Sequence, residues 1–393
     1  MELGTRPLVL LAASGAILSA CATPPRSCPP PAPTPVPHVE YDSARWSDLP
    51  GWHADDMRAA WPAFLASCGA LGQRAGWVAV CTAAQELRPL TTQDVRTFFE
   101  RSFEPYRIIE RVGARTQREG LITGYFEPEL RGGRSPSARF NTPLYSPPPD
   151  LLTVELGSLY PELKGKRVRA RLEGTRVVPY YSRSELERDA ALKGHELVWV
   201  DDAIDAFLLE VQGSGRVQLA DGETIRLHYA DENGYPYRSI GRYLVDHGEL
   251  TVAEATLPGI RAWARQHPGR VKELLDADPS VVFFRAEPLG DPALGPPGAL
   301  GVPLTAGRSL AIDPRSIPLG APLFLATTFP ASDAPLERLA LAQDTGGAIR
   351  GAVRADLFWG TGSQAADPAG RMRQQGRLWL IWPKGVPLPE RSP

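Results

Sequence analysis

Proline and glycine interrupt this chain along its length. There are 40 Pro and 37 Gly among 393 residues, and only 22% of the residues are charged. Each proline lacks the backbone N–H that a helix interior or a central strand uses, and its ring breaks a helix. This composition favours a loop-rich and strand-rich enzyme or binding protein over a helical bundle.

Length and charge narrow the classes further. A chain of 393 residues is long enough for two domains with a sizeable core. Its net charge of -2 gives no excess charge to attract nucleic acid or an anionic membrane surface. The six histidines are scattered and no Cys/His spacing matches a metal site. We therefore expect no nucleic-acid partner, no metal and no cofactor.

The N-terminus carries a targeting signal. Arg6 precedes an apolar run from Pro7 to Leu18 that is too short to span a bilayer, and Leu18-Ser19-Ala20-Cys21 follows. This sequence resembles the bacterial lipoprotein box, which implies a signal peptide over 1–20 and acylation of Cys21. Ala22 resembles the residue found in lipoproteins sorted to the outer membrane. The expected product is an outer-membrane lipoprotein facing the periplasm of a Gram-negative bacterium, tethered rather than spanning. The alternative is an ordinary signal peptide with a chance cysteine.

Residues 21–40 form a proline-rich spacer, which favours extended polyproline II. Of the remaining cysteines, Cys28 lies in this spacer, whereas Cys68 and Cys81 lie in one helical region. An oxidising periplasm favours a disulfide between Cys68 and Cys81, with free buried thiols as the alternative.

Helical and strand patterns alternate along the remaining chain. Tyr41 to Gln117 is mainly helical in pattern, with an N-cap signal at Thr91. Short strands, at spacings typical of a small barrel, are expected at Leu121–Phe126, Val177–Tyr181, Glu196–Val200, Phe207–Val211 and Thr224–Tyr229.

A second helical stretch begins at Ser239 and continues through Ala253–Gln266 and Arg270–Asp276. Further strands are expected at Leu310–Ile312, Pro322–Ala326, Leu339–Gln343, Val353–Phe358 and Arg377–Trp382. The sequence shows no internal repeat and no transmembrane helix.

Three aspartates occupy the glycine-rich C-terminal part of the chain: Asp313, Asp344 and Asp356. Glycine lets backbone approach a ligand, and a carboxylate beside aromatic residues can be partly desolvated and so stay protonated. The alternative is that Gly346 and Gly347 form a hairpin turn while the aspartates cap turns.

Three other clusters combine glycine with hydroxyl, amide or ring groups, at Thr123–Pro128, Val211–Gly215 and Asn233–Gly241. Such a mixture suits a carbohydrate, whose faces stack on rings and whose hydroxyls bind polar groups. Taken singly, each cluster is also compatible with a turn. The candidate substrate-binding residues are Thr123, Tyr125, Glu127, Gln212, Ser214, Tyr237, Ser239, Gly346 and Gly347.

In order, these motifs resemble the family of membrane-bound lytic murein transglycosylase A. The resemblance runs through Gly124–Pro128, Val211–Gly215, Tyr237–Gly241, Phe283-Phe284-Arg285 and the three-aspartate segment, and covers nearly all of the chain after the spacer. It implies a mixed, mainly β fold with helices. A discontinuous double-psi β-barrel domain (41–123 and 230–388, with the three-aspartate segment at 300–385) would be interrupted by a smaller β-barrel at 124–229, with a groove between them for a glycan strand.

The same resemblance assigns roles to the aspartates. The family's catalytic acid matches Asp356, while Asp344 and Asp313 match its two other aspartates and are expected to support it. Asp344 would either raise the proton affinity of Asp356 through like charge or hold the Gly346-Gly347 turn, and Asp313 would set a turn. The sequence alone does not separate these roles.

The implied activity is a lytic exotransglycosylase that cleaves the β-1,4 bond between N-acetylmuramic acid and N-acetylglucosamine without hydrolysis. The sequence itself leaves endo or exo action open. One aspartate would act as acid and then as base, which needs a pKa raised about 2 units above about 3.9. Leu357, Phe358, Trp359 and Asp344 are the residues expected to raise it. The expected partners are a peptidoglycan strand, a lipid anchor and cell-wall synthesis or division proteins, and a monomer is expected.

Two other functions fit parts of the sequence. Asp344-Thr345-Gly346 also resembles an aspartic protease signature, but a single-chain enzyme of that type needs a second such motif, and this chain has none. A non-catalytic glycan-binding lipoprotein on the same fold is the other alternative, and the presence of Asp356 argues against it.

Overall fold

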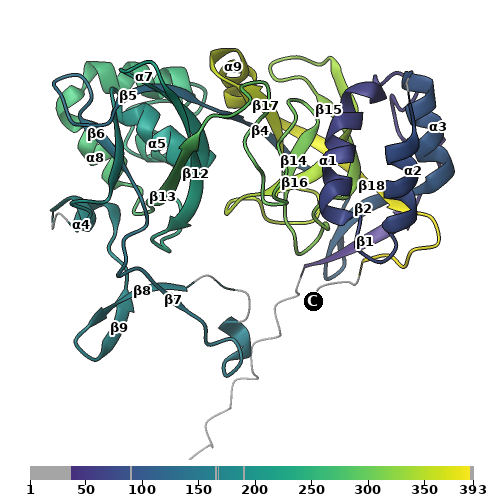
Figure 1. Ribbon diagram of the computed structural model, residues 1–393, viewed down its shortest axis with the longest axis horizontal. Helices are drawn as coiled ribbons and strands as arrows, with labels where there is room; N and C mark the ends of the chain where they lie inside the picture. The colour runs from purple at the N-terminus through teal and green to yellow at the C-terminus, as the bar shows by residue number, and fades with distance from the viewer. Residues whose placement is uncertain (1–36, 89–90, 164–165, 167, 189–190, 390–393) are drawn as a thin grey trace, which may run out of the picture. The chain divides into compact units, whose positions relative to one another are not determined.

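The computed structural model describes residues 37–88, 91–163, 166, 168–188 and 191–389 (Figure 1). The predicted signal peptide, Cys21 and nearly all of the spacer lie outside these residues. Within the described part, no helix combines the length and the apolar character needed to cross a bilayer.

Six strands close into a barrel, in the order β18-β15-β16-β14-β17-β4 with a final pairing between β18 and β4. The β14–β16 and β17–β4 pairs are parallel and the other four are antiparallel. The strands are β4 (Gly120–Glu127), β14 (Ser309–Ile312), β15 (Pro322–Thr328), β16 (Pro335–Thr345), β17 (Ala355–Thr361) and β18 (Arg373–Pro383). Because β4 precedes the insert and the other five strands follow it, the discontinuous barrel expected from the sequence is confirmed.

The sequence explains why these strands form the core. β14 is buried at every position and β15 at all but its last, and Leu310–Ile312 and Pro322–Ala326 are continuous apolar runs rather than alternating ones, as in strands covered on both faces. Helices cover this barrel on one side: α1 (Trp61–Leu71), α2 (Val78–Glu86) and α3 (Thr92–Ser102) (Figure 1). A disulfide joins Cys68 on α1 to Cys81 on α2, with their Cα atoms 5.3 Å apart.

The N-terminal region is less helical than its pattern predicted. Thr91 does cap α3, through a capping box with Asp94. Residues 103–117, however, form β2 (Phe103–Val112) and β3 (Arg115–Gln117), and β2 pairs with β1 (His38–Ser43) and β18. The expectation of helix here was wrong, because Pro105 opposes a helix while the buried β-branched residues Ile108 and Ile109 suit a strand.

A second sheet has the strand order β13-β12-β11-β5-β10-β6, and its two edge strands, β6 and β13, contact each other. Its strands are β5 (Glu129–Gly133), β6 (Thr142–Tyr145), β10 (Glu196–Val200), β11 (Ser214–Leu219), β12 (Thr224–Glu232) and β13 (Val282–Pro288). Because β13 pairs with β12, this sheet extends beyond residue 229, the end expected for the insert from the sequence. We propose that the inserted domain runs from Glu129 to Pro288.

Helices accompany this second sheet, namely α5 (Ala203–Gln212), α6 (Ile240–Asp246), α7 (Leu257–Gln266) and α8 (Val271–Asp276). The strand expected at Phe207–Val211 was wrong, because these residues belong to α5. Asp202 caps the helix by accepting from the backbone N–H groups of Ile204 and Asp205, and Gly213 ends it at a φ of 78°.

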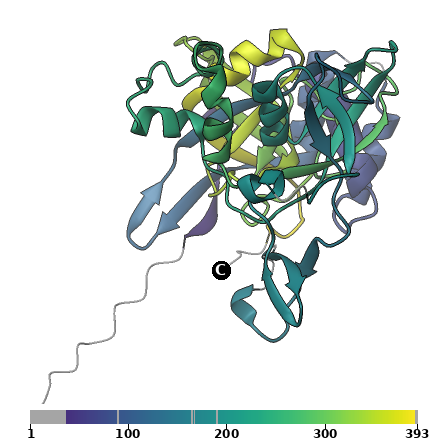
Figure 2. The same ribbon diagram turned by 90° about the vertical axis from the view of Figure 1, so that its left-hand side faces the viewer.

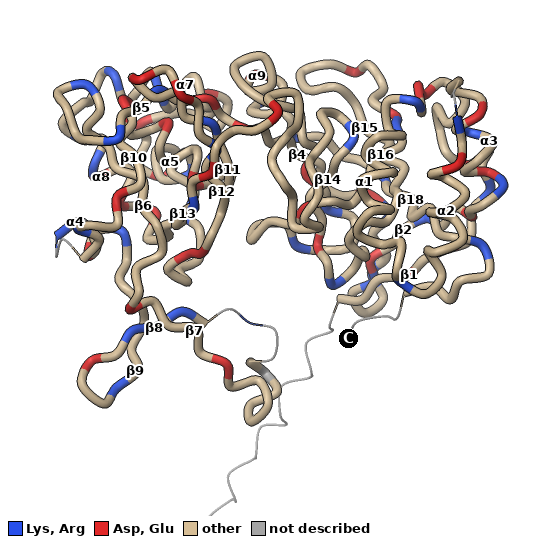
Figure 3. Tube along the Cα trace, viewed as in Figure 1, with Lys and Arg blue, Asp and Glu red and all other residues tan. Residues whose placement is uncertain are grey.

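A third, smaller sheet consists of β7 (Leu152–Val154), β8 (Val168–Glu173) and β9 (Arg176–Pro179), followed by α4 (Arg183–Arg188) (Figures 1 and 2). The last helix, α9 (Ser363–Arg371), lies between β17 and β18 in sequence and packs on β4. Acidic and basic residues are interspersed along the described trace (Figure 3).

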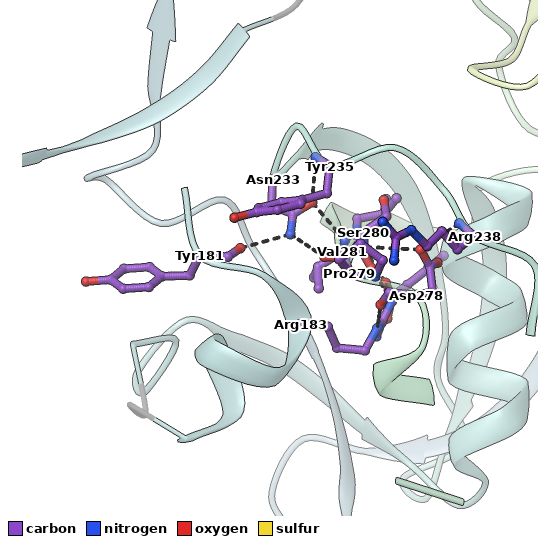
Figure 4. Close-up of polar contacts among 11 residues, drawn as sticks. Tyr181, Arg183, Asn233, Tyr235, Arg238, Asp278, Pro279, Ser280 and Val281 are labelled. Carbon is purple, nitrogen blue, oxygen red and sulfur yellow. Dashed lines mark hydrogen bonds and ion pairs between the residues drawn. The ribbon is translucent and has the colours of Figure 1, made fainter. Parts of the chain in front are cut away.

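Asn233 organises the polar cluster that the sequence singled out at Asn233–Gly241 (Figure 4). It is 1% exposed, and its Nδ2 donates to the carbonyl oxygens of Tyr181 (2.9 Å) and Pro279 (2.8 Å). Its Oδ1 accepts from the Val281 N–H at 3.0 Å. The amide therefore ties its own segment to two others, at Tyr181 and at 279–281, through backbone groups.

Glu127, at the end of β4, joins the two main sheets. It is fully buried and accepts from Arg216 Nε (2.8 Å), Arg226 Nε (2.7 Å) and Thr361 Oγ1 (2.8 Å). The two arginines belong to β11 and β12 of the second sheet, whereas Thr361 belongs to β17 of the barrel. Both arginines also donate to the carbonyl oxygen of Leu294.

Neutralising Glu127 should destabilise the protein strongly. Glu127→Gln removes the buried carboxylate that pairs with both guanidinium groups and leaves Arg216 with the more distant and exposed Glu129, so we expect the free energy of unfolding to fall by about 3 kcal/mol. Glu129→Gln is the matched control, because its side chain is 54% exposed and its carboxylate lies 3.8 Å from Arg216, so its effect should be about 0.5 kcal/mol or less. Denaturant unfolding measures both changes, and equal effects of the two substitutions would contradict the structural role of Glu127.

Candidate active site

The barrel brings Asp344 and Asp356 to either side of one strand. Ala311 on β14 pairs with Asp344 on β16 and with Asp356 on β17. Two strand spacings separate the aspartate backbones, or roughly 10 Å. Within the described residues no hydrogen bond joins the two carboxylates, so they do not form the proton-sharing pair that an aspartic protease requires.

Asp356 has the environment of an acid. Its Oδ1 accepts from the Thr123 hydroxyl at 2.7 Å, because the parallel register places Asp356 opposite Thr123 on β4. Burial raises the pKa of Asp356 from 3.8 to about 6, against the lowering effects of the Thr123 hydrogen bond and the Arg354 charge, and the Asp344 charge adds to the rise. An aspartate with this pKa is protonated far more often near neutral pH than an ordinary one.

Asp344 is held by donors on both oxygens. Oδ2 accepts from the Tyr125 hydroxyl at 2.9 Å and Oδ1 from the Ala299 N–H at 2.9 Å. Burial raises the pKa of Asp344, and the hydrogen bonds from Ala299, Thr345 and Tyr125 oppose this rise. The centroids of the Tyr125 and Phe358 rings lie 5.3 Å apart, so Tyr125 spans from Asp344 to the strand that carries Asp356.

Asp313 has a different environment, although it belongs to the same trio. It is 1% exposed and accepts from Arg315 Nη2 (2.7 Å) and from the Gly351 N–H (2.9 Å). Burial alone would raise the pKa of Asp313, but the hydrogen bonds from Arg315 and Gly351 outweigh it and the pKa is lowered. Asp313 therefore stays ionised and ties the segment before β17 to the end of β14.

The glycines of the site serve different purposes. Gly346 and Gly347 follow β16, and the Ile349 N–H donates to the Gly346 carbonyl at 3.0 Å, which closes a turn. A Cβ on Gly347 would meet nothing within 4 Å, so packing does not require glycine there. Gly124 is required, because a Cβ would lie 2.6 Å from Trp359 Nε1 and 2.9 Å from Ala369 Cα.

The other predicted substrate-binding residues fall into two groups. Glu127 is fully buried, and its carboxylate is enclosed by Arg216, Arg226 and Thr361. Gln212 accepts from the Phe126 N–H at 2.9 Å, and Ser239 caps α6.

Ser214 begins β11 and is partly exposed, and the Tyr237 side chain is 46% exposed. Thr123 and Tyr125 are thus the two predicted residues that contact the carboxylates directly.

Two groups at the site were missed by sequence reasoning. Ala299 acts through its backbone N–H, which no side-chain pattern reveals. Arg354 donates from Nη2 to Thr123 Oγ1 at 2.8 Å. Its position two residues before Asp356, on the same face of an expected strand, was a signal that could have identified it.

Cavities and metal sites do not identify this centre. A cavity of about 480 Å³ lies beside α9 and is lined by residues including Phe126, Arg261 and Gly362, but not by the three aspartates. In the described ranges no group of three or more His, Cys, Asp or Glu side chains is placed to hold a metal ion.

The opposite pKa shifts of Asp356 and Asp313 predict opposite effects on stability. Asp356 has a higher pKa in the folded than in the unfolded protein, so its contribution to stability is lost as pH rises from 3.8 to about 6. Asp356→Asn should therefore stabilise the protein at pH 7.5, on the order of 3 kcal/mol, and this gain should vanish below pH 4.

Asp313→Asn is the matched comparison. Because the pKa of Asp313 is lowered in the fold, its ionised form stabilises the protein at neutral pH and this stabilisation is lost as pH falls through the folded-state pKa. The substitution should destabilise at pH 7.5 and much less at acid pH. Thermal unfolding across this pH range measures both, and shifts of the same sign for the two variants at pH 7.5 would contradict the assignment.

Known proteins are similar to this chain in both sequence and fold. Residues 121–285 match the MltA specific insert domain and residues 308–382 match the 3D domain. The chain is 31% identical over 267 residues to membrane-bound lytic murein transglycosylase A of Escherichia coli (strain K12), a match that covers 66% of this chain and 65% of that protein's length.

Solved structures extend this similarity. MltA from Neisseria gonorrhoeae superposes with a TM-score of 0.76 and 36% identity, covering 89% of this chain and 94% of that one. E. coli MltA with bound chitohexaose superposes with a TM-score of 0.61 and 26% identity, covering 88% and 91%. The two matched domains, the shared fold and the identity over nearly all of the N. gonorrhoeae protein show that this chain belongs to the MltA family.

Proposed function

We propose that this protein is a peptidoglycan lytic transglycosylase and that Asp356 is its catalytic residue. The observation that carries the proposal is the environment of Asp356, a carboxyl group with a pKa raised to about 6 and one oxygen held by a hydroxyl. The names of its relatives describe enzymes that act on murein, and an E. coli relative binds chitohexaose. The proposed substrate is therefore the glycan strand of peptidoglycan.

A single acid suffices for this reaction. Protonated Asp356 donates its proton to the oxygen of the β-1,4 bond between N-acetylmuramic acid and N-acetylglucosamine, and that bond breaks. The resulting carboxylate then accepts the proton of the muramic acid C6 hydroxyl as its oxygen bonds to C1. The product has a 1,6-anhydromuramoyl end, and no water is consumed.

The hydrogen bonds of the two other aspartates support a mechanism with a single catalytic acid. Glycosidases that hydrolyse their substrates use two carboxyl groups, one of which activates water or attacks the sugar. Here both oxygens of Asp344 accept hydrogen bonds from Tyr125 and Ala299, and those of Asp313 accept from Arg315 and Gly351. Asp344 then acts by raising the proton affinity of Asp356, and Asp313 by holding the backbone.

The proposed location is the membrane surface. The lipobox-like sequence ending at Cys21 supports acylation of that residue, and curated relatives are named membrane-bound. A proline-rich spacer between Cys21 and residue 40 would let the enzyme reach the glycan while it stays attached. Attachment to the outer membrane, facing the periplasm, fits both the substrate and the Cys68–Cys81 disulfide.

Product analysis tests the reaction. Protein lacking residues 1–21 should release 1,6-anhydromuropeptides from murein sacculi, and mass spectrometry identifies them. Asp356→Asn should reduce this release at least about 100-fold, as expected for loss of general acid–base catalysis, and should still bind glycan. Products with reducing muramic acid ends would indicate a hydrolase, and glycan binding without turnover by the unmodified protein would indicate a binding protein.

The pH dependence of turnover gives a second test. Because the first step needs protonated Asp356, kcat/KM should fall on the alkaline side with an apparent pKa of about 6. A rate that stays constant from pH 5 to pH 8 would exclude Asp356 as the acid.

Tyr125→Phe removes a hydrogen-bond donor to Asp344 without removing a charge, so activity should be retained in part.

A further inference from the structure

We propose that Arg354 and Thr123 act as a fixed pair that determines which oxygen of Asp356 carries the catalytic proton. The inference rests on the proposed role of Asp356 as the acid. It assigns positioning roles to two side chains, one on β4 and one immediately before β17. Neither residue donates a proton in the reaction.

The direction of the hydrogen bonds follows from the donors available. A guanidinium group has only donors and keeps its charge in proteins. In the contact of Arg354 Nη2 with Thr123 Oγ1 (2.8 Å), the hydroxyl oxygen therefore accepts. The hydroxyl has one proton, and the acceptor that lies 2.7 Å away is Asp356 Oδ1. The Thr123 proton thus points at Oδ1.

Arg354 is itself held in place by the backbone. Its Nη1 donates to the Leu121 carbonyl of β4 at 3.4 Å and to the Ala355 carbonyl of β17. No carboxylate in the described ranges lies within ion-pair distance of its guanidinium nitrogens. The side chain therefore bridges the two parallel strands that carry Thr123 and Asp356, and it is not committed to an acidic partner.

This arrangement leaves only Oδ2 for the acidic proton. A proton on Oδ1 would face the proton of Thr123, and Thr123 cannot turn its proton toward Arg354, which is a donor. No described residue donates a hydrogen bond to Oδ2. In the first step the Oδ2–H bond breaks and its proton passes to the glycosidic oxygen. In the second, Oδ2 accepts the proton of the C6 hydroxyl, so one oxygen performs both transfers while the Arg354 and Thr123 protons stay in place.

Arg354 and Thr123 also limit how far the pKa of Asp356 rises. The Thr123 hydrogen bond and the Arg354 charge each lower the pKa of Asp356, against the rise that burial causes. Removing either should move the alkaline limb of the pH–rate profile upward. A residue that only supports the fold would not produce this shift.

Substitutions at both positions test the pair. Thr123→Val removes the hydroxyl at constant shape, and Arg354→Met removes the guanidinium while keeping an unbranched apolar stem. Each should lower kcat on soluble murein glycan about tenfold, the loss of about 1.4 kcal/mol of transition-state stabilisation, with little change in KM. Thr123→Ser should restore kcat to within about threefold of the unmodified enzyme.

A variant that combines Thr123→Val with Arg354→Met shows whether Arg354 acts through the Thr123 hydroxyl or through its charge alone. If Arg354 acts through Thr123, then Arg354→Met should lower kcat by less than about twofold in the Thr123→Val background. Arg350→Met is a charge-matched control, since the hydrogen bonds of Arg350 to the described residues go to the backbone carbonyls of Gly346 and Ile349, and the kcat of this variant should stay unchanged. Thermal unfolding confirms that each variant is folded before its rate is measured.

Two outcomes would overturn the pair. Multiplicative losses in the double variant would mean that Arg354 acts independently of Thr123, and a Thr123→Val enzyme with an unchanged kcat and pH profile would remove the role of the hydroxyl. Failure of the proposed function has a different signature. An unmodified protein that forms no anhydro product, or an Asp356→Asn variant that remains active, would overturn the assignment of Asp356 itself.

Discussion

The fully buried carboxylate of Glu127 is the interaction on which the arrangement of this protein depends. It ends a barrel strand, yet its strongest partners are two arginines on neighbouring strands of the inserted sheet. A buried ion cluster of this kind adds modest net stability, but losing one member is costly because the others remain charged. It therefore holds the end of β4 against the paired Arg216 and Arg226 of β11 and β12, more than it strengthens the fold.

Three aspartates that look equivalent in sequence have become three different groups. Asp313 receives enough hydrogen bonds to stay ionised despite burial, Asp344 receives donors on both oxygens, and Asp356 receives one hydroxyl and one nearby positive charge. The number and direction of donors decide each role, since burial acts on all three, on Asp313 fully and on Asp344 and Asp356 in part. Asp356 thus differs from Asp313 and Asp344 because fewer hydrogen-bond donors of the protein stabilise its ionised form.

Sequence reasoning predicted those parts of the molecule that depend on local pattern. The strands of the barrel, the Thr91 cap and the three aspartates are readable because periodicity, capping and motif order are local. It failed at 103–117, where Pro105, Ile108 and Ile109 were local signals against a helix and where pairing of β2 with β1 and β18 fixes the strand. Phe207–Val211 is a similar case, since Asp202 and Gly213 were local helix signals that could have been used. Glu127 illustrates a limit set by distant partners, because a glutamate in a glycine-aromatic motif looks like a ligand contact until its buried arginines are known.

Strand β4 places Thr123, Tyr125 and Glu127 at alternate positions, so one face of a single strand holds the partner of the acid, the partner of Asp344 and the joint to the insert. A one-residue insertion or deletion between Thr123 and Glu127 would turn part of this set to the opposite face. The loops of the inserted domain can change in length without moving these residues. A change of spacing within β4 would instead disturb both the contacts of the catalytic acid and the junction between the barrel and the insert. Variation in substrate preference within such a scaffold should therefore accumulate outside this strand.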